Sequence, residues 1–201
     1  MSFFVEYEPN DKKELEKNSF YNKYNLSIRK VKLEDCKHIA QISYERDGDE
    51  KGDYNKSFQS FEKKIKLVLD QDKRNQRELF VATIIEDNDE EIIIGFSYIE
   101  YCDFTDRVKF KDITASSGFY LLGLIVALKY RRLGIAEKLT IKRISWVKEN
   151  LPSEKKVYYF TNIRNQTSTA FHKILGFKEI GKQLEFPKRN PLRTIYYEIV
   201  I

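Results

Sequence analysis

The stretch that decides the fold runs from Leu122 to Ala136 and reads LGLIVALKYRRLGIA. Its first part continues a nearly unbroken apolar run that starts at Phe119, which predicts a strand buried on both faces. A short basic turn follows this strand near Val126, and Gly134 then opens a helix. Free backbone N–H groups, the positive end of a helix dipole and the guanidinium groups of the turn would meet there. The stretch therefore predicts a binding site for a phosphate-like anion.

Charge along the chain supports an anionic ligand but leaves its class open. The turn carries Lys129, Arg131 and Arg132, and matches neither the GxxxxGK[ST] nor the GxGxxG phosphate motif. The segment Lys129–Lys156 holds nine Lys and Arg against three Glu, a net charge of +6, in a chain whose total is +5. Such a concentration indicates a polyanionic partner, either a nucleic acid or a phosphorylated cofactor. An ordinary strand–turn–helix with solvated charges is the alternative.

Outward from this stretch, strands and helices are expected along most of the chain. Residues 1–24 are charged and weakly periodic, which predicts an N-terminal extension before a domain at 25–201. Period-two and apolar runs predict strands at 25–32, 78–86, 91–101, 119–128, 157–161, 178–186 and 194–201. Helical spacing predicts helices at 32–46, 57–71, 134–150 and 167–175. This order favours a single three-layer α/β domain.

Composition excludes several classes of protein. The chain has 201 residues, of which 41% are hydrophobic, which is enough for a folded core. We expect no membrane-spanning helix, because no apolar run approaches about 18 residues. We expect no signal peptide, because Glu6 and Glu8 interrupt the apolar N-terminus, and therefore a cytoplasmic protein. The only cysteines are Cys36 and Cys102, and the only histidines are His38 and His172. These four residues form neither a disulfide framework nor a zinc motif, so no metal is expected.

Two motifs in this sequence resemble those of a known family. Arg131, Gly134 and Ala136 form R-x-x-G-x-A, which resembles the acyl-CoA pyrophosphate motif [Q/R]-x-x-G-x-[G/A] of the GNAT superfamily of N-acyltransferases. Val126 lies five residues before Arg131, which is the usual offset in that family. Downstream, NQTSTAFHKILGF at Asn165–Phe177 is similar to the family pattern N-x-x-[A/S]-x-x-[L/F]-[Y/H]-x-x-x-G-F. Two motifs in the family order are far more specific than either alone.

The resemblance covers residues 25–201 and implies both a fold and an activity. The implied fold is a central mixed, mostly antiparallel sheet flanked by helices, in which the fourth strand splays from the fifth. The implied activity is transfer of an acetyl group from acetyl-CoA to a primary amine, expected to be that of a small molecule, by direct attack in a ternary complex. Acetyl-CoA and the amine would be the partners. We expect neither nucleic acid nor membrane among them.

The resemblance also assigns the residues that would hold acetyl-CoA. Exposed amides of Leu124 and Val126 would pair with the pantetheine arm and help to polarise the thioester carbonyl, as oxyanion-hole donors do. Asn165 would hydrogen-bond the same arm. The turn and helix start would bind the CoA diphosphate through the positions Arg131, Arg132, Leu133, Gly134, Ile135 and Ala136.

Catalysis in the family needs a group that takes the amine proton, and it benefits from an acid beside the departing thiolate. His172 stands where most members carry the tyrosine acid, and an imidazole can act as acid or base near neutral pH. A structural role for His172 is the alternative. Tyr120 occupies the position of the glutamate base found in histone-modifying relatives. Substitute bases acting through water are Glu100, Tyr101 and Asp103, of which we prefer Glu100.

Other functions and the acceptor remain open at this stage. An acyl-CoA-binding module without turnover would explain the missing Tyr and Glu, and a nucleic-acid-binding protein would use the basic segment. The loop 47–56 carries four acids that would suit a cationic amine, and 186–193 would also shape the acceptor site. Tyr196, Tyr197 and Ile199 near the end of the chain could form an edge-strand homodimer interface.

Several single residues have simpler explanations. Lys138, Lys142 and Arg143 are expected on the exposed face of the helix 134–150, from which one of them could reach the 3′-phosphate of CoA. His38 is expected at the surface at the start of a helix. Cys102 is explained by packing in its strand rather than by nucleophilic catalysis.

Overall fold

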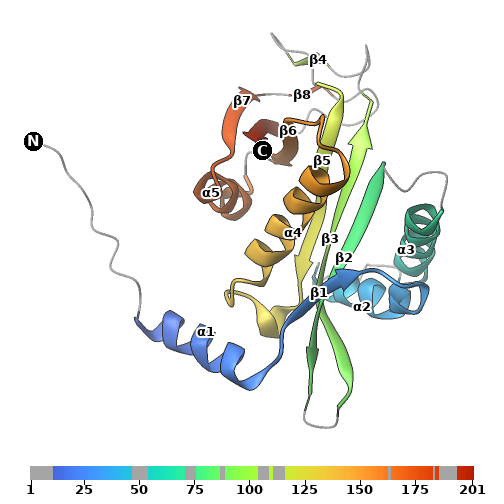
Figure 1. The fold of residues 1–201 in the computed structure, drawn as a ribbon, viewed down its shortest axis with the longest axis vertical. Helices are drawn as coiled ribbons and strands as arrows, with labels where there is room; N and C mark the ends of the chain where they lie inside the picture. The colour runs from blue at the N-terminus through green and yellow to red at the C-terminus, as the bar shows by residue number, and fades with distance from the viewer. Residues whose placement is uncertain are drawn as a thin grey trace, which may run out of the picture.

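The structure is a computed structural model that describes residues 11–46, 54–70, 76–86, 89–103, 109–110, 116–162, 164–182, 184–185 and 194–201. Its helices are α1 (Asp11–Lys23), α2 (Cys36–Arg46), α3 (Tyr54–Leu69), α4 (Ile135–Asn150) and α5 (Gln166–Ile174) (Figure 1). Its strands are β1 (Ser27–Lys30), β2 (Arg77–Ile85), β3 (Glu91–Cys102), β4 (Lys109–Phe110), β5 (Gly118–Val126), β6 (Lys156–Asn162), β7 (Lys178–Lys182), β8 (Leu184–Glu185) and β9 (Thr194–Val200).

Seven of these strands form one mixed sheet in the order β1-β2-β3-β5-β6-β9-β7. Only β5 and β6 pair in parallel, and every other neighbouring pair in this sheet is antiparallel. The short strands β4 and β8 pair with each other. The predicted α/β fold with a mixed, mostly antiparallel sheet is therefore confirmed.

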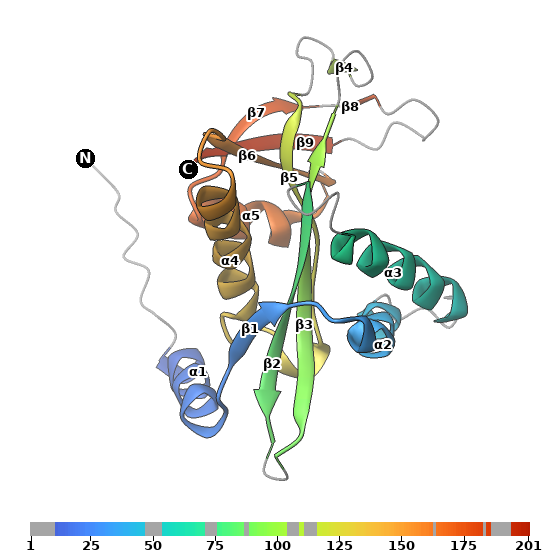
Figure 2. The same ribbon diagram turned by 45° about the vertical axis from the view of Figure 1, so that its right-hand side comes forward.

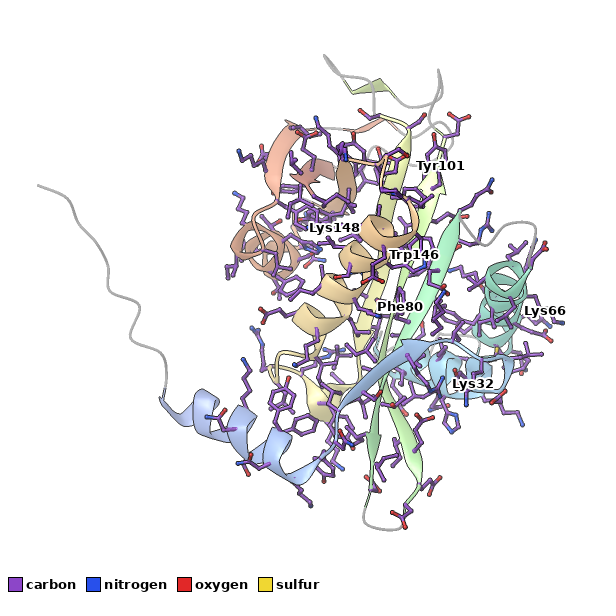
Figure 3. The ribbon with its side chains drawn as sticks, in the orientation of Figure 1. Lys32, Lys66, Phe80, Tyr101, Trp146 and Lys148 are labelled. Carbon is purple, nitrogen blue, oxygen red and sulfur yellow. The ribbon has the colours of Figure 1, made fainter. Side chains whose placement is uncertain are left out.

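Helices cover both faces of the sheet, as Figure 2 shows for α2 and α3 on one side and α4 and α5 on the other. Strand alternation distributes the apolar side chains between the two layers. Phe80 and Ala82 of β2 pack into the core under α4, whereas Leu79 and Val81 pack into the core under α2 and α3. Trp146 of α4 belongs to the same core as Phe80 (Figure 3). Burial on both faces gives the expected three layers.

The sheet opens between β5 and β6. The two strands pair only at Phe119 with Val157 and at Tyr120 with Tyr158. Beyond these pairs β5 continues to Val126 and β6 to Asn162. We call this opening the splay. It exposes backbone groups of β5 that a continuous sheet would pair.

The N-terminal segment contributes to the core although its sequence is polar. α1 places Phe20, which is only 8% exposed, in the cluster under α4. The ring of Phe20 lies 6.0 Å from the ring of Tyr130, in the turn before α4. The division of the chain at residue 24 stays a prediction.

The C-terminal strand is not at an edge of the sheet. β9 pairs with β6 on one side and with β7 on the other. The side chain of Tyr197 is completely buried. The expected edge-strand position of β9 is therefore wrong, because β9 inserts between β6 and the earlier strand β7, which takes the edge; the homodimer itself stays a prediction.

Candidate active site

The basic turn between β5 and α4 has the backbone geometry of an anion site. Gly134 has a φ of +78° and immediately precedes α4, and Arg132 has a φ of +69°. Lys138 donates its N–H to the Gly134 carbonyl at 3.2 Å. This is the first helical bond of α4, so the N–H groups of Ile135 and Ala136 have no carbonyl partner within the helix. The positive φ of Arg132 costs about 1 kcal/mol or more, so the folded turn holds this residue in a strained backbone conformation.

Arg131 fastens the turn to the end of the strand. Its Nε donates to the carbonyl oxygen of Val126 at 3.0 Å, across five residues. Arg131 and Arg132 are exposed residues, and Leu133 and Gly134 are half-buried. The motif residues thus form one short loop whose amides and cations share one end of α4.

The amides of Leu124 and Val126 face the splay. Ala127 donates its N–H to the Ile94 carbonyl of β3 at 2.9 Å. Because N–H groups alternate along a strand, those of Val126 and Leu124 point away from β3, toward β6. A bulge at Gly123 brings about this register: Ser97 of β3 pairs with Leu124, but the next residue pairs with Leu122. Gly123 adopts a φ of +53°, which glycine allows at low cost.

On the other side of the splay, α5 presents Asn165, Ser168 and His172 in one stripe, as their spacing predicted. Asn165 caps the helix, since its Oδ1 accepts the Ser168 N–H at 3.1 Å. The Ser168 carbonyl lies 2.8 Å from His172 Nδ1. A carbonyl can only accept, so Nδ1 carries the hydrogen and Nε2 carries the lone pair. The side chain of Asn165 keeps its amide nitrogen available for a ligand.

His172 is buried among aromatic rings. It is 5% exposed and stacks on Tyr159 at 3.7 Å between ring centroids, with Phe171 and Phe177 edge-on. Burial, opposed by the bond to the Ser168 carbonyl and aided by the charge of Arg143, lowers the pKa of His172 to about 4. The imidazole of the free protein is therefore neutral at pH 7.

Arg143 is the residue that the sequence analysis misplaced. It was expected on the exposed face of α4 with Lys138 and Lys142, but it is only 1% exposed. Its Nη1 donates to the Tyr98 carbonyl at 3.2 Å and its Nη2 donates to Thr140 Oγ1 at 2.9 Å. Its Nε has no partner among the described residues. Burial alone lowers its pKa, to about 9, so the guanidinium remains charged at neutral pH.

A signal for the burial of Arg143 was present in the sequence. Arg143 lies four residues after Leu139 and three before Trp146, and both of these side chains are buried. This spacing places it on the apolar face of the helix. The charge of Arg143 predicted an exposed side chain, and that prediction was wrong.

Tyr120 and Glu100 lie on the face opposite His172. Tyr120 of β5 pairs with Glu100 of β3. Their neighbours Phe119 and Ile99 pack under α4, and side chains alternate along a strand, so Tyr120 and Glu100 point to the other face. The completely buried Tyr120 hydroxyl donates to the Ser116 carbonyl at 2.6 Å. Glu100 accepts from Arg77 Nη2 at 3.1 Å. Both side chains are thus already engaged, and toward a ligand each can act as an acceptor.

The remaining candidates are explained by local structure. The carboxylate of Asp103 accepts from Ser117 Oγ at 2.9 Å, and Tyr101 packs edge-on against Phe119. Burial raises the pKa of Cys102 to about 12, with Glu100 adding to the effect, which argues against a thiolate nucleophile.

Further sequence predictions concern surfaces, metals and membranes. His38 is exposed on α2, as expected. Within the part of the chain that the structure describes, no three His, Cys, Asp or Glu side chains gather as a metal site. No helix in that same part is long and apolar enough to cross a membrane. The acids expected to shape the acceptor site at 47–53, and the loop 186–193, lie outside the described residues.

Comparisons with known proteins agree with this geometry. A family model described as acetyltransferase (GNAT) family matches residues 33–177. No curated protein matches the chain. The structure is similar to Arabidopsis thaliana NAA60 in complex with acetyl-CoA, with a TM-score of 0.62 and 19% identity over 88% of this chain and 100% of that one.

Two bacterial structures show the same fold. A chimera of the spermidine N-acetyltransferase SpeG from Vibrio cholerae and hSSAT has a TM-score of 0.61 and 16% identity, over 87% of this chain and 95% of that one. A protein of the GNAT family from Desulfovibrio desulfuricans has a TM-score of 0.63 and 13% identity, over 88% and 99%.

Proposed function

The chain belongs to the acetyltransferase (GNAT) family, and we propose that it moves an acetyl group from acetyl-CoA to a primary amine of a small molecule within a ternary complex. One observation carries the proposal: β5 leads into a basic turn that opens α4, and beyond Tyr120 the edge of β5 does not pair with β6. A thioester arm and a diphosphate could then be held by one continuous stretch of backbone.

The residues around β5 fit acetyl-CoA. The diphosphate would meet the amides of the turn from Arg132 to Ala136, together with the charge of Arg131. The pantetheine arm would lie along the splay against the amides of Leu124 and Val126, and the Asn165 side-chain amide would donate to it. These groups are N–H donors with no carbonyl partner in the strand or helix, and a carbonyl and phosphate ligand would supply the missing acceptors.

The residues that we propose for catalysis lie on both faces of the sheet. Acetyl-CoA supplies an acetyl group activated as a thioester. The Leu124 amide is aimed at the splay, where it would stabilise negative charge on the carbonyl oxygen. On the face of α2 and α3, Glu100 can take the proton that the acceptor ammonium loses, through a water, and the Tyr120 hydroxyl oxygen can accept a hydrogen bond from the attacking amine. On the α5 face, His172 Nε2 offers a lone pair beside the splay.

Our proposal makes His172 a neutral group in the resting protein. To act as an acid, His172 would have to be protonated before the reaction, and burial opposes this because it lowers the pKa of His172 to about 4. His172 Nε2 would therefore take the proton that the attacking nitrogen loses in the tetrahedral intermediate and pass it to the thiolate as the C–S bond breaks. This differs from a tyrosine acid, which arrives at the reaction with its proton.

A cationic amine is the acceptor that we propose. The loop 47–56 is rich in acids, and Glu100 adds a carboxylate on the adjacent face. One protein of similar fold is a spermidine N-acetyltransferase, which makes polyamines a reasonable first class to test. The cytoplasm, where acetyl-CoA and polyamines are available, is the proposed location.

Calorimetric titration with acetyl-CoA tests the cofactor. We expect one-to-one binding by the wild type and loss of binding in an Arg131→Ala/Gly134→Asp variant, because an aspartate at the turn repels phosphate. A panel of amines then identifies the acceptor by release of free CoA. Absence of binding by the wild type would overturn the proposal and direct attention to nucleic acid as the ligand of the basic segment.

A second candidate is an acyl-CoA-binding module without turnover. The observation that favours it is that Tyr120 replaces the glutamate and the buried, neutral His172 replaces the tyrosine. Acetyl transfer by the wild type but not by His172→Ala would exclude this candidate. Tight binding with no transfer to any amine, in both proteins, would support it.

A further inference from the structure

The helix α1 touches the phosphate turn although it lies outside the segment that the family model matches. Figure 1 shows α1 beside the turn that leads into α4. The hydroxyl of Tyr21 donates to the Leu133 carbonyl at 2.6 Å. A Cβ placed on Gly134 would lie 3.2 Å from Lys17 Cε and 3.6 Å from Lys17 Nζ. Two consecutive turns of α1 thus lie against Leu133 and Gly134, the two residues that precede α4.

Tyr21 fixes the orientation of one peptide group in the turn. In a trans peptide the carbonyl oxygen and the following N–H point in opposite directions. Because the Leu133 oxygen is directed at the Tyr21 hydroxyl, the N–H of Gly134 points away from that hydroxyl. Burial, aided by Glu137, raises the pKa of Tyr21, so its hydroxyl keeps its proton and remains a donor at neutral pH. The bond leaves the amide turned outward, as an anion requires.

Lys17 brings a positive charge to the same place. Its side chain is half-buried against the turn, and no ion pair of its ammonium is found among the described residues. A hollow of about 490 Å³ lies between the end of α1 and Lys138 in the first turn of α4, lined by Tyr21, Tyr24 and Lys138 among others. A ligand with phosphate groups could therefore lie between α1 and the start of α4.

We propose that α1 forms one wall of the acyl-CoA site, in which Lys17 pairs with the diphosphate and Tyr21 is a positioning residue for the Gly134 amide. This inference rests on the proposed function. It extends the site beyond the turn itself to a helix that the motif does not contain. The ion pair would be formed only with ligand bound, and the hydrogen bond exists without it.

The test compares Lys17→Gln and Tyr21→Phe with the wild type and with Lys37→Gln. Lys37 is exposed on α2, across the sheet, so its variant matches the charge change without touching the turn. Calorimetry with CoA should show affinity about three- to tenfold weaker for Lys17→Gln and about two- to tenfold weaker for Tyr21→Phe. The salt dependence of binding should also become shallower for Lys17→Gln. Lys37→Gln should match the wild type.

A truncated donor separates a contact from a loss of structure. Acetyl-pantetheine lacks the diphosphate, so both variants should use it as well as the wild type does. With acetyl-CoA as donor, KM should rise while kcat is unchanged. An equal loss with both donors would overturn the inference, because it would indicate a general change in the site.

The remaining outcomes are also decisive. If the wild type binds CoA and both variants bind it within about twofold, the inference fails and the proposed function stands. If Lys17→Gln binds more tightly, α1 covers the turn rather than completing it, and the inference again fails. If the wild type binds no CoA, the proposed function and the inference fail together. Thermal unfolding of each variant checks that it is folded at the assay temperature.

Discussion

Replacing the buried Arg143 with methionine should leave the protein at least as stable as the wild type while slowing acetyl transfer. The guanidinium is 1% exposed and no acid compensates its charge, since burial is the sole cause of its lowered pKa. The fall in the pKa of Arg143 to about 9 corresponds to about 5 kcal/mol against the charged form. Methionine removes that penalty and fills a similar elongated space.

The hydrogen bonds lost in this variant are worth less than the penalty removed. The Tyr98 carbonyl loses its donor, which costs about 1–3 kcal/mol for a buried acceptor. Thr140 keeps its own bond to the Ala136 carbonyl at 2.9 Å. The net effect should be a free energy of unfolding higher by about 1–4 kcal/mol, as found when apolar residues replace buried charges.

Activity should fall for a separate reason. Arg143 holds the Tyr98 carbonyl beside the bulge at Gly123, and this bulge sets the direction of the Leu124 amide. Without the guanidinium we expect kcat to fall about tenfold, as happens when a support behind a site is removed.

Urea unfolding of the wild type, Arg143→Met and Arg143→Lys at pH 7, combined with rates of CoA release, tests both parts. A loss of more than about 2 kcal/mol in the methionine variant would refute the energetic argument. Unchanged kcat in a stable methionine variant would refute the link to the bulge.

Three other changes have expected outcomes. The pKa of His172 in the folded protein lies near 4, below its usual value, so as the pH falls the unfolded chain binds this proton first and the wild type loses stability. The free energy of unfolding lost between pH 7 and pH 4.5, measured with urea, should therefore be about 2–3 kcal/mol smaller in His172→Asn than in the wild type. Gly134→Ala and Gly176→Ala both place a side chain at positive φ and should each cost about 1–2 kcal/mol in thermal unfolding, but only Gly134→Ala should weaken CoA binding; equal effects on binding would contradict the placement of the turn. Cys102→Ala should keep full activity, and iodoacetamide at pH 8 should label Cys102 slowly, as mass spectrometry can show; rapid labelling that stops turnover would instead make it a catalytic thiol.

Much of the fold could be predicted because its signals are local. The apolar run before Val126, the basic turn and Gly134 are adjacent in the sequence, and the structure places a strand, a turn and a helix there. The stripe of Asn165, Ser168 and His172 likewise depends only on helical spacing, and the hydrogen bonds along α5 agree with it.

Strand order could not be predicted in the same way. β9 lies between β6 and β7 because of pairing between residues far apart in the chain, and nothing in 194–201 distinguishes an edge strand from a central one. The strand expected at 178–186 also divides into β7 and β8, of which β8 pairs with β4 outside the main sheet. Such choices depend on partners rather than on composition.

The protonation state of His172 also could not be predicted from the sequence. His172 was expected to titrate near neutrality, as an isolated imidazole does. The structure surrounds it with Tyr159 from β6, Phe177 after α5 and the charge of Arg143 from α4. Each comes from a different element, so their joint effect exists only after the fold has formed. The motif identified the position of the residue but not its charge.

The polar N-terminal helix shows why a weak periodic signal does not imply an independent segment. α1 has no continuous apolar stripe, and its attachment depends on a few aromatic contacts. Phe20 packs against Tyr130 within the core, and Tyr21 bonds to Leu133, so the turn before α4 takes part in both contacts. A helix held mainly by the turn would be stabilised whenever a ligand orders that turn. If α1 contacts the diphosphate as we propose, ordering of α1 and binding of acyl-CoA are thermodynamically linked, and each should strengthen the other.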